Sequence, residues 1–246
     1  MTQNTAQYDV CAVGNAIVDV LSPCDAAFLT AQDLAPNSMQ LVDAERSAAL
    51  YDAMAPGVEA SGGSAGNTVY LEGYLFDPAP ARAAFERAAA AAHKAGRKVA
   101  ITLSDTFVVA RWRAELLSFI EQSADIVLAN EAELAALFET EDFDAAAAKL
   151  AAIVEIAAVT RGEHGSVVIA GDERVTVAAY PVAKVIDTTG AGDQYAAGFL
   201  LGVARGLTLE EAGKLGSLAA SEVIAHWGPR PMVKLADLAG EAGLRL

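Results

Sequence analysis

Short runs of β-branched and other apolar residues alternate along the chain with longer alanine-rich segments that have apolar residues at helical spacing. This alternation predicts parallel strands connected by helices, the pattern of an α/β protein. We expect strands at residues 8–13, 69–75, 98–103, 125–129, 153–160, 166–170 and 174–179. We expect helices at residues 81–95, 131–138, 143–151, 191–204 and 209–225. The pattern contains no internal repeat, so a single domain over residues 1–246 is expected.

Residues 14–60 fit this alternation least well. Runs at 17–21 and 38–42 look like strands, and they flank Pro23 and Pro36. We therefore expect a small sheet within residues 16–45 that projects from the main body. The pattern leaves open whether this sheet is a lid or an ordinary β-hairpin excursion without a function.

The composition excludes several classes of function. The 246 residues are 54% hydrophobic, which is enough for a substantial core. With 17 Lys and Arg against 32 Asp and Glu, the net charge is −15, so the chain repels nucleic-acid backbones and anionic membranes. It has two cysteines, Cys11 and Cys24, no secretion signal at its start, and no apolar run of the roughly 20 residues that cross a bilayer. We expect a soluble cytoplasmic protein with no nucleic-acid or membrane partner.

Residues 185–199 carry the strongest local signal. An apolar run ends in a Gly-Ala-Gly turn at 190–192 and leads into an expected helix on which Tyr195, Phe199 and Val203 recur at four-residue spacing. Backbone N–H groups and the helix dipole at such a start bind an anion without a lysine. Alternatively, Asp193 only caps the helix and the glycines only turn the chain. The local pattern leaves both interpretations open.

Three further stretches combine small and polar residues at strand ends. Residues 159–166 join two expected strands through Gly162 and Gly165, as a hairpin turn does. Asn130 followed by Glu133 matches a capping box, although a carboxylate at a strand end also suits magnesium held through water. Residues 60–68 form a glycine-rich loop, which suits the close approach of a ligand or a flexible linker.

Five segments together resemble one known family. They are Gly-Asn-Ala-Ile-Val-Asp at 14–19, Gly-Gly-Ser-Ala-Gly-Asn at 62–67, Asn-Glu-Ala-Glu at 130–133, Thr-Arg-Gly-Glu-His-Gly at 160–165 and Asp-Thr-Thr-Gly-Ala-Gly-Asp at 187–193. In this order they resemble the ribokinase and adenosine kinase family of PfkB-type carbohydrate and nucleoside kinases. The resemblance implies a three-layer α/β/α sandwich with a small β lid, and transfer of the ATP γ-phosphate to a primary hydroxyl.

The resemblance also implies roles for individual residues, with ATP, magnesium and a monovalent cation such as K⁺ as cofactors. Asp193 matches the general base, and the anion hole is matched by Gly190, Ala191 and Gly192. Asn130 matches a position that organises phosphate, and Glu133 one that organises magnesium through water. Positions near the nucleotide are matched by Thr160, Gly162 and Gly165. Asp187 and Thr189 fall where many members hold the monovalent cation.

On the acceptor side, the positions that hydrogen-bond sugar hydroxyls in the family are matched by Asn15, Asp19, Gly63 and Asn67. A carboxylate with amides suits a polyol, because Asp19 accepts hydroxyl protons while Asn67 both donates and accepts. Met39 either faces a nucleobase or packs in the core or lid. His226 either lies near adenine or serves as a cation at a helix end.

The chain departs from the family after residue 68. It passes at once into residues 69–76, which resemble a strand found much later in the family, so an internal block is missing. Part of the acceptor pocket and of the lid belongs to that block. Because lost strands expose edges and apolar faces, we expect rearranged strand pairing or a homodimer.

The leading hypothesis is an ATP-dependent kinase that acts on a ribonucleoside or a sugar. Adenosine is favoured by residues 14–19 and by Ser-Met-Gln-Leu-Val-Asp at 38–43, while ribose or another sugar stays open. The alternative is a nucleotide-binding family member with little or no kinase turnover, because the lid and part of the acceptor site are missing. A scaffold without a site would require all five ordered segments to be coincidental.

Overall fold

The computed structural model describes residues 10–13, 19–21, 24–34, 46, 49–50, 53, 58–60, 68–77 and 79–244. The chain forms two compact units. The larger unit consists of Met1–Ala16 and Gly62–Leu246, and the smaller one of Ile17–Ser61. The excursion predicted at 16–45 falls almost wholly in the smaller unit.

The larger unit is built on a seven-stranded sheet with the order β1-β4-β5-β6-β7-β8-β9. Strands β1, β4, β5, β6 and β7 pair in parallel. Strand β8 pairs antiparallel with both of its neighbours, β7 and β9. The carboxyl ends of the parallel strands therefore meet at one edge of the sheet. The strands are β1 Val10–Val13, β4 Thr68–Glu72, β5 Lys98–Thr102, β6 Ile126–Asn130, β7 Ile156–Thr160, β8 Ser166–Ala170 and β9 Glu173–Val177.

Each of the seven strands overlaps a run predicted from the sequence, with bounds that differ by up to three residues. The prediction at 69–75 was too long, because the chain leaves β4 after Glu72 and forms a 3₁₀ turn, Gly73–Phe76. A Cβ at Gly73 would lie 2.7 Å from the carbonyl oxygen of Leu103, so this close approach of two backbones requires glycine. The strand directly after the 62–67 loop pairs with both β1 and β5.

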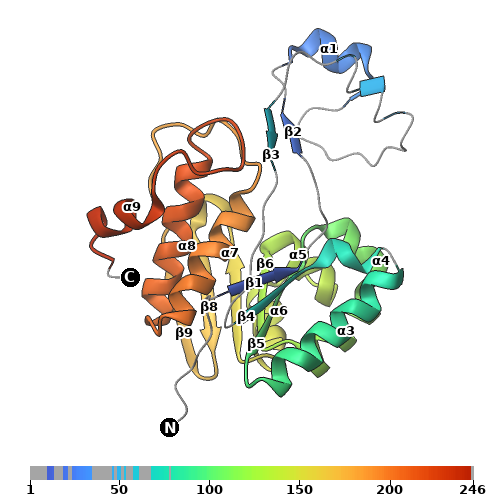
Figure 1. Ribbon diagram of the computed structural model, residues 1–246, viewed down its shortest axis with the longest axis vertical. Coiled ribbons are helices and arrows are strands. Elements are labelled where there is room, and N and C mark those ends of the chain that lie inside the picture. Colours follow the sequence, from blue (N-terminus) through green and yellow to red (C-terminus); the bar gives the residue numbers. More distant parts are fainter. Residues whose placement is uncertain are drawn as a thin grey trace. The chain divides into compact units, whose positions relative to one another are not determined.

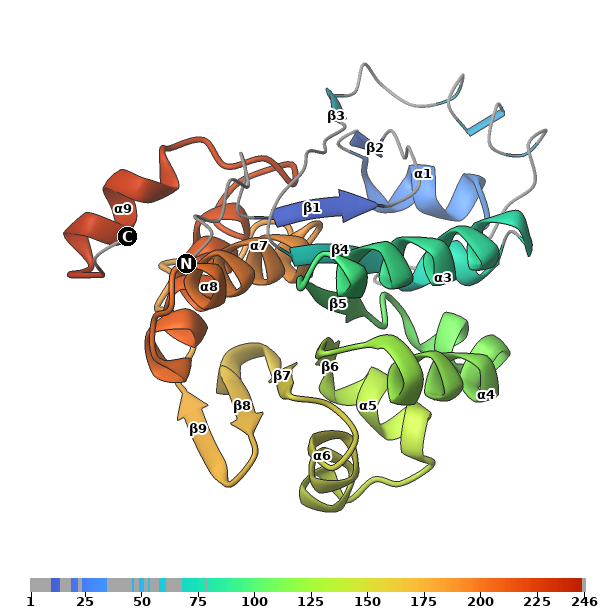
Figure 2. The same cartoon turned by 60° about the horizontal axis from the view of Figure 1, so that its bottom comes forward.

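Helices cover both faces of the sheet, which confirms the expected three-layer α/β/α sandwich (Figure 1). One face carries α7 and α8, and the other carries the helices from α3 to α6 (Figures 1 and 2). No helix in the described ranges is long and apolar enough to span a membrane. The helices are α3 Ala79–Lys94, α4 Thr106–Ser123, α5 Glu131–Phe138, α6 Phe143–Ala151, α7 Ala191–Ala204, α8 Leu209–Val223 and α9 Leu235–Glu241.

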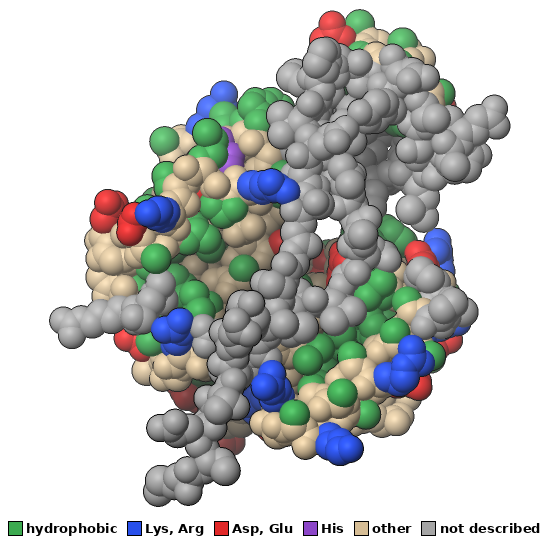
Figure 3. All heavy atoms as spheres, in the orientation of Figure 1, with side chains coloured by type: hydrophobic (Ala, Val, Ile, Leu, Met, Phe, Trp, Pro, Cys, Tyr) green, Lys and Arg blue, Asp and Glu red, His purple; other side chains and the backbone are tan. Residues whose placement is uncertain are grey.

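Alternation along the central strands divides the core between the two layers. Val99 and Ile101 of β5 are buried in the cluster on the α3–α6 side, whereas Ala100 between them belongs to the cluster on the α7 side. In β6, Val127 faces the first cluster and Leu128 the second. Each buried aliphatic side chain stabilises the fold by about 1.5–3 kcal/mol relative to an exposed one. On the face shown in Figure 3, Lys and Arg side chains are scattered rather than gathered in a patch.

The smaller unit contains a two-stranded antiparallel sheet of β2 Asp19–Leu21 and β3 Val58–Ala60. It also contains α1 Ala26–Ala31, whose first turn is capped by the carboxylate of Asp25. A small sheet was predicted here, but β3 was not identified as the partner of β2. The other predicted strand, 38–42, lies outside the described residues. The role of this sheet as a lid stays a prediction.

Glycines let α7 and α8 approach each other closely. A Cβ at Gly198 would lie 2.6 Å from the carbonyl oxygen of Leu215, and one at Gly202 would lie 2.8 Å from the Cα of Ala212. The hydroxyl of Tyr195 donates to the Oγ of Ser166, at 2.8 Å, and so ties the first turns of α7 to β8. These contacts hold the start of α7 in place.

We expect Gly198→Ala to destabilise the protein by roughly 1–3 kcal/mol, because the added methyl group forces two backbones apart. Gly240→Ala is the matched control, since it lies in α9 and a Cβ there meets nothing within 4 Å. The control should be neutral or slightly stabilising, as alanine favours helix. Urea denaturation of both variants measures the difference. Equal stabilities would contradict close packing at Gly198.

Candidate active site

A glycine turn opens α7. Gly190 is its N-cap, with φ 75° and ψ 2°, a left-handed conformation that favours glycine. No side chain caps the turn. A Cβ at Gly192 would meet open space, whereas one at Gly190 would lie 2.5 Å from the Cβ of Pro229. The predicted helix start at residue 191 is confirmed. Backbone N–H groups and the positive end of the helix dipole together suit an anion at this turn.

Asp193 lies in the first turn of α7 and is exposed to solvent. Its charge acts on two tyrosines at or near the carboxyl end of β4. Burial is the main cause of the raised pKa of Tyr70, and the Asp193 charge raises it further. The pKa of Tyr74 is also raised, mainly by burial, with a smaller effect from Asp193. Asp193 therefore lies outside the apolar core, where a ligand can reach its carboxylate. Its role as a base stays a prediction.

Asn130 and Glu133 form the predicted capping box at the start of α5. The Oδ1 of Asn130 accepts from the amide of Glu133 at 2.8 Å, and the Oε2 of Glu133 accepts from the amide of Asn130 at 2.9 Å. The Oε1 of Glu133 accepts from the Nδ2 of Asn130 at 2.7 Å. Glu133 is only 5% exposed. Burial raises its pKa to about 7, opposed by the Asn130 amide and reinforced by the charge of Asp105.

The donor set fits magnesium held through water better than magnesium held directly. Both oxygens of Glu133 already accept hydrogen bonds from Asn130. Among the described residues, no three His, Cys, Asp or Glu side chains group as metal ligands. Magnesium usually keeps several waters and needs only one or two carboxylates. The predicted role of Glu133 is compatible with this arrangement.

The predicted turn after β7 is a β-hairpin turn. It contains a short 3₁₀ helix, Gly162–His164, and both glycines have positive φ, 56° at Gly162 and 82° at Gly165. A Cβ at Gly165 would lie 2.0 Å from the carbonyl oxygen of Val177. In the parallel register, Thr160 pairs with Asn130, so two of the predicted nucleotide-binding residues are neighbours on adjacent strands.

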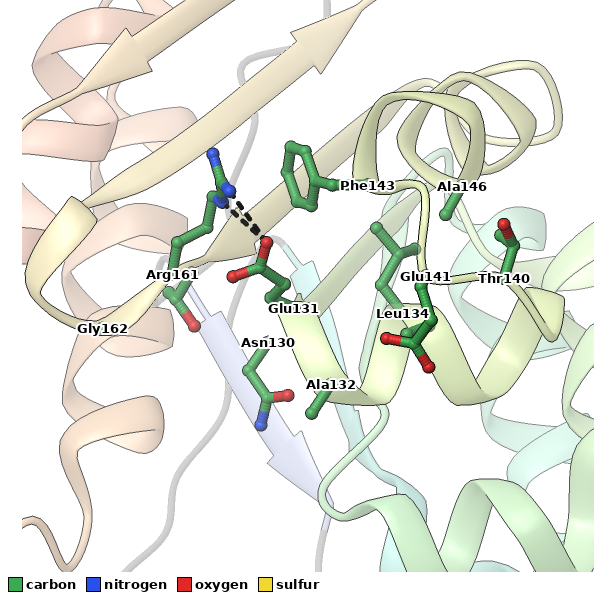
Figure 4. A pocket seen from close by; sticks show the side chains of 12 residues that line it. Asn130, Glu131, Ala132, Leu134, Thr140, Glu141, Phe143, Ala146, Arg161 and Gly162 are labelled. Atoms are coloured by element: carbon green, nitrogen blue, oxygen red, sulfur yellow. Dashed lines mark hydrogen bonds and ion pairs between the residues drawn. The ribbon is translucent and has the colours of Figure 1, made fainter.

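A pocket of about 400 Å³ lies beside this pair, between the start of α5, the α5–α6 connection and the end of β7 (Figure 4). Arg161 reaches into it. Its Nη2 and Nε donate to one oxygen of Glu131, at 2.8 and 3.2 Å, and its guanidinium lies 4.1 Å from the centre of the Phe143 ring. Sequence reasoning missed these three residues. The signal available was an arginine inside the turn and an acidic residue directly after Asn130.

Asp187 holds the segment before the glycine turn. Its Oδ1 accepts from the amide of Thr189 at 2.9 Å, and its Oδ2 accepts from the amide of Gly228 at 3.1 Å. Burial alone would raise the pKa of Asp187, but these hydrogen bonds outweigh it and hold the pKa below its usual range. Asp187 is therefore a carboxylate fixed in its charged form. Its role with Thr189 in holding a monovalent cation stays a prediction.

His226 lies just after α8, where a helix-end cation was one of two interpretations. Its Nε2 is 3.2 Å from the Oε2 of Glu222, and its Nδ1 is 3.1 Å from the carbonyl oxygen of Trp227. Burial acts to lower the pKa of His226, but the bonds to Trp227 and Glu222 outweigh it and raise the pKa above its usual value. A contact with adenine stays a prediction.

The structure describes little of the predicted acceptor site. Asn15, Gly63 and Asn67 lie outside the described residues, as does Met39. Asp19 is the first residue of β2 in the smaller unit, and only its backbone is described. In the larger unit, Asn130 and Thr160 are neighbours on adjacent strands. The roles of the catalytic, nucleotide-binding and acceptor residues all stay predictions.

Comparisons with known proteins agree on one family. The sequence profile of the pfkB family carbohydrate kinases matches residues 23–235. A probable sugar kinase protein from Rhizobium etli has a TM-score of 0.92 and 35% identity, over 98% of this chain and 100% of that one. The adenosine kinase from Sinorhizobium meliloti has a TM-score of 0.90 and 38% identity, over 96% of this chain and 100% of that one.

Among curated relatives, an uncharacterized sugar kinase from Archaeoglobus fulgidus is 42% identical over 113 residues. The match covers 45% of this chain and 44% of that protein. The chain spans less than half the length of the curated relatives it matches. The likeness to these relatives is therefore one of shared segments, whereas the likeness to the two solved structures extends over nearly the whole chain.

We expect Glu133 to make the stability of the metal-free protein depend on pH. Because its pKa is raised in the folded state, to about 7, its neutral form contributes stability that is complete below the unfolded pKa near 4.5 and is lost as pH rises through 7. The loss is on the order of 3 kcal/mol. Glu133→Gln, which preserves the capping box, should remove this dependence. Urea denaturation in EDTA at pH 5 and pH 8 measures it.

Glu211→Gln provides the matched control, because Glu211 completes a capping box with Thr208 at the start of α8. The bonds from Thr208 lower the pKa of this exposed carboxyl. Its contribution to stability therefore depends on pH in the direction opposite to that of Glu133. It is present above the unfolded pKa and is lost as pH falls through the folded pKa. If wild type and Glu133→Gln showed parallel pH profiles, burial would not control the charge of Glu133.

Proposed function

Because the chain belongs to the pfkB family of carbohydrate kinases, we propose that it transfers the γ-phosphoryl group of ATP to a primary hydroxyl of a nucleoside or sugar. The observation that carries the proposal is the uncapped glycine turn at the start of α7, with the carboxylate of Asp193 in the same helical turn. In this proposal an anion site and a proton acceptor thus lie within one helical turn. Phosphoryl transfer needs both.

In this proposal Asp193 accepts the proton of the acceptor hydroxyl, and the N–H groups of Gly190 and Gly192 stabilise the charge of the transferred phosphoryl group. The N–H of Ala191 donates instead to the carbonyl oxygen of Thr188, at 3.1 Å. The transition state is loose, so positioning and charge stabilisation matter more than a strong base. An exposed aspartate is sufficient for that task. Magnesium held by Glu133 through water supplies positive charge beside the phosphates when it is bound. Asn130, Thr160 and the hairpin turn after β7 orient the nucleotide.

For the acceptor, the proposal is a ribonucleoside, with adenosine tested first. The likeness to an adenosine kinase over 96% of this chain supports it, as do the segments at 14–19 and 38–43. Ribose and other sugars are the alternatives. A coupled ATP turnover assay with adenosine, cytidine, ribose, fructose and ketodeoxygluconate, run beside calorimetry with ATP, decides among them. ATP binding without acceptor-stimulated turnover would instead mean a nucleotide-binding protein that has lost catalysis.

Asp193→Asn should slow acceptor phosphorylation by roughly 10²- to 10⁴-fold, because the amide keeps the shape of the side chain but cannot accept the proton. ATP affinity should change little. Steady-state kinetics and calorimetry on the same preparation measure the two effects. Turnover at the wild-type level would show that Asp193 is not the base.

Gly192→Val tests the glycine turn separately. A Cβ at this position meets open space within 4 Å, so the variant should fold. It would instead occupy the space that the phosphate approaches, and we expect ATP affinity to fall at least tenfold along with turnover. Calorimetry measures the affinity, and thermal denaturation checks the fold. Unchanged ATP affinity would place the phosphates elsewhere.

A further inference from the structure

The connection between α8 and α9, residues 224–234, borders the glycine turn. Its large apolar side chains point into solvent, with Trp227 67%, Met232 75% and Val233 51% exposed. Burial of these side chains therefore contributes little to holding the connection in place. Its backbone is instead tied by polar contacts to α8 and to the segment before α7.

Glu222, in the last turn of α8, makes two of these contacts. Its Oε1 accepts from the amide of Met232 at 2.9 Å, and its Oε2 lies 3.2 Å from the Nε2 of His226. The Nδ1 of His226 in turn lies 3.1 Å from the carbonyl oxygen of Trp227. One carboxylate thus contacts both ends of the 226–232 segment.

The buried position of the Glu222 carboxylate destabilises the folded state unless these contacts are made. Its side chain is only 9% exposed, and burial of a carboxylate is unfavourable without partners. The negative end of the helix dipole adds a further unfavourable interaction with an acid in the last turn. The amide of Met232 and the imidazole of His226 offset both effects. The arrangement therefore links the charge of Glu222 to one particular position of the 226–232 segment.

The same segment packs against the glycine turn. The amide of Gly228 donates to Asp187, which also accepts from Thr189. The Nε2 of Gln194 in α7 donates to the carbonyl oxygen of Pro229 at 3.3 Å. A Cβ at Gly190 would collide with Pro229, at 2.5 Å, so the two residues are in close contact. Where Pro229 lies therefore determines where the backbone of Gly190 can lie.

We propose that Glu222 is a positioning residue of the phosphoryl-transfer site. It holds the 226–232 segment against the glycine turn and so aligns the N–H groups of Gly190 and Gly192 with the phosphoryl group. The inference rests on the proposed function for its chemical consequence. The mechanical link between Glu222 and the glycine turn is independent of the proposed function. The link and its effect on catalysis are tested separately.

The kinetic test compares Glu222→Ala and Glu222→Gln with wild type. A misplaced anion site loses more of its stabilisation of the transition state than of the bound ground state. Glu222→Ala should therefore lower kcat about 10- to 100-fold and leave KM for the acceptor within threefold. Glu222→Gln keeps an oxygen for the amide of Met232 and should retain most of the activity. The control is Glu210→Ala in the first turn of α8, where the carboxylate is 57% exposed and pairs with Lys214. Its kcat should stay within twofold of wild type.

Hydrogen exchange followed by mass spectrometry tests the link without any turnover. In Glu222→Ala, exchange should speed up in peptides covering residues 224–234 and also in those covering 187–194, with the sheet unchanged. Faster exchange in 224–234 alone, or an unchanged kcat, would overturn the positioning role. If the alanine variant does not fold, Glu222→Asp replaces it, because the shorter side chain cannot reach the amide of Met232 and the imidazole of His226 as Glu222 does. Wild-type kcat together with wild-type exchange in Glu222→Asp would then overturn the positioning role. Wild type that lacks turnover with every acceptor would refute the proposed function, and the exchange result would still decide the link.

Discussion

The close contact between α7 and α8 determines where the candidate active site can form. Gly198 and Gly202 on α7 face Leu215 and Ala212 on α8, so the two helices run antiparallel with their backbones nearly touching. The start of α7 and the end of α8 therefore lie at the same edge of the sheet. The glycine turn belongs to the first of these ends, and the segment that packs against it follows the second. A shift between the two helices would move both sides of the anion site relative to each other.

Much of the larger unit could be predicted from the sequence, because its strands and helices are marked by patterns that act over short distances. Short runs of β-branched and other apolar residues mark β5 and β6, and the glycine turn with its four-residue stripe marks the start of α7. The helix α4 was not predicted. Its first four residues, Thr106 to Val109, include a phenylalanine and two valines, which favour strands, and Trp112 has a non-helical conformation. The carboxylate of Asp105 caps its first turn, and the burial of Leu116 and Ile120 stabilises the helix against the sheet.

The parts of the site that escaped prediction depend on contacts between residues far apart in sequence. Arg161 meets Glu131 and Phe143 only because β7 lies beside β6 in the parallel sheet, and no pattern within a short window encodes that pairing. Glu222 meets Met232 across a connection without regular structure. Short-range motifs were easier to predict, and the capping box at the start of α5 is confirmed, whereas its role at a nucleotide site stays a prediction. Asn130 and Glu133 form a capping box, and the same bonds orient a carboxylate at the edge where a nucleotide would lie.

Under the proposed function, the acidity of the chain makes an anion site built from backbone advantageous. With a net charge of −15, a nucleotide triphosphate is repelled at long range, so attraction has to come from groups close to the phosphates. The N–H groups and helix dipole at residues 190–192 provide it without adding a side-chain charge. The carboxylates around them are held in different states. Hydrogen bonds from Thr189 and Gly228 keep Asp187 charged, whereas burial raises the pKa of Glu133 to about 7. The two carboxylates therefore differ in what controls their charge, which is hydrogen bonding for Asp187 and burial for Glu133.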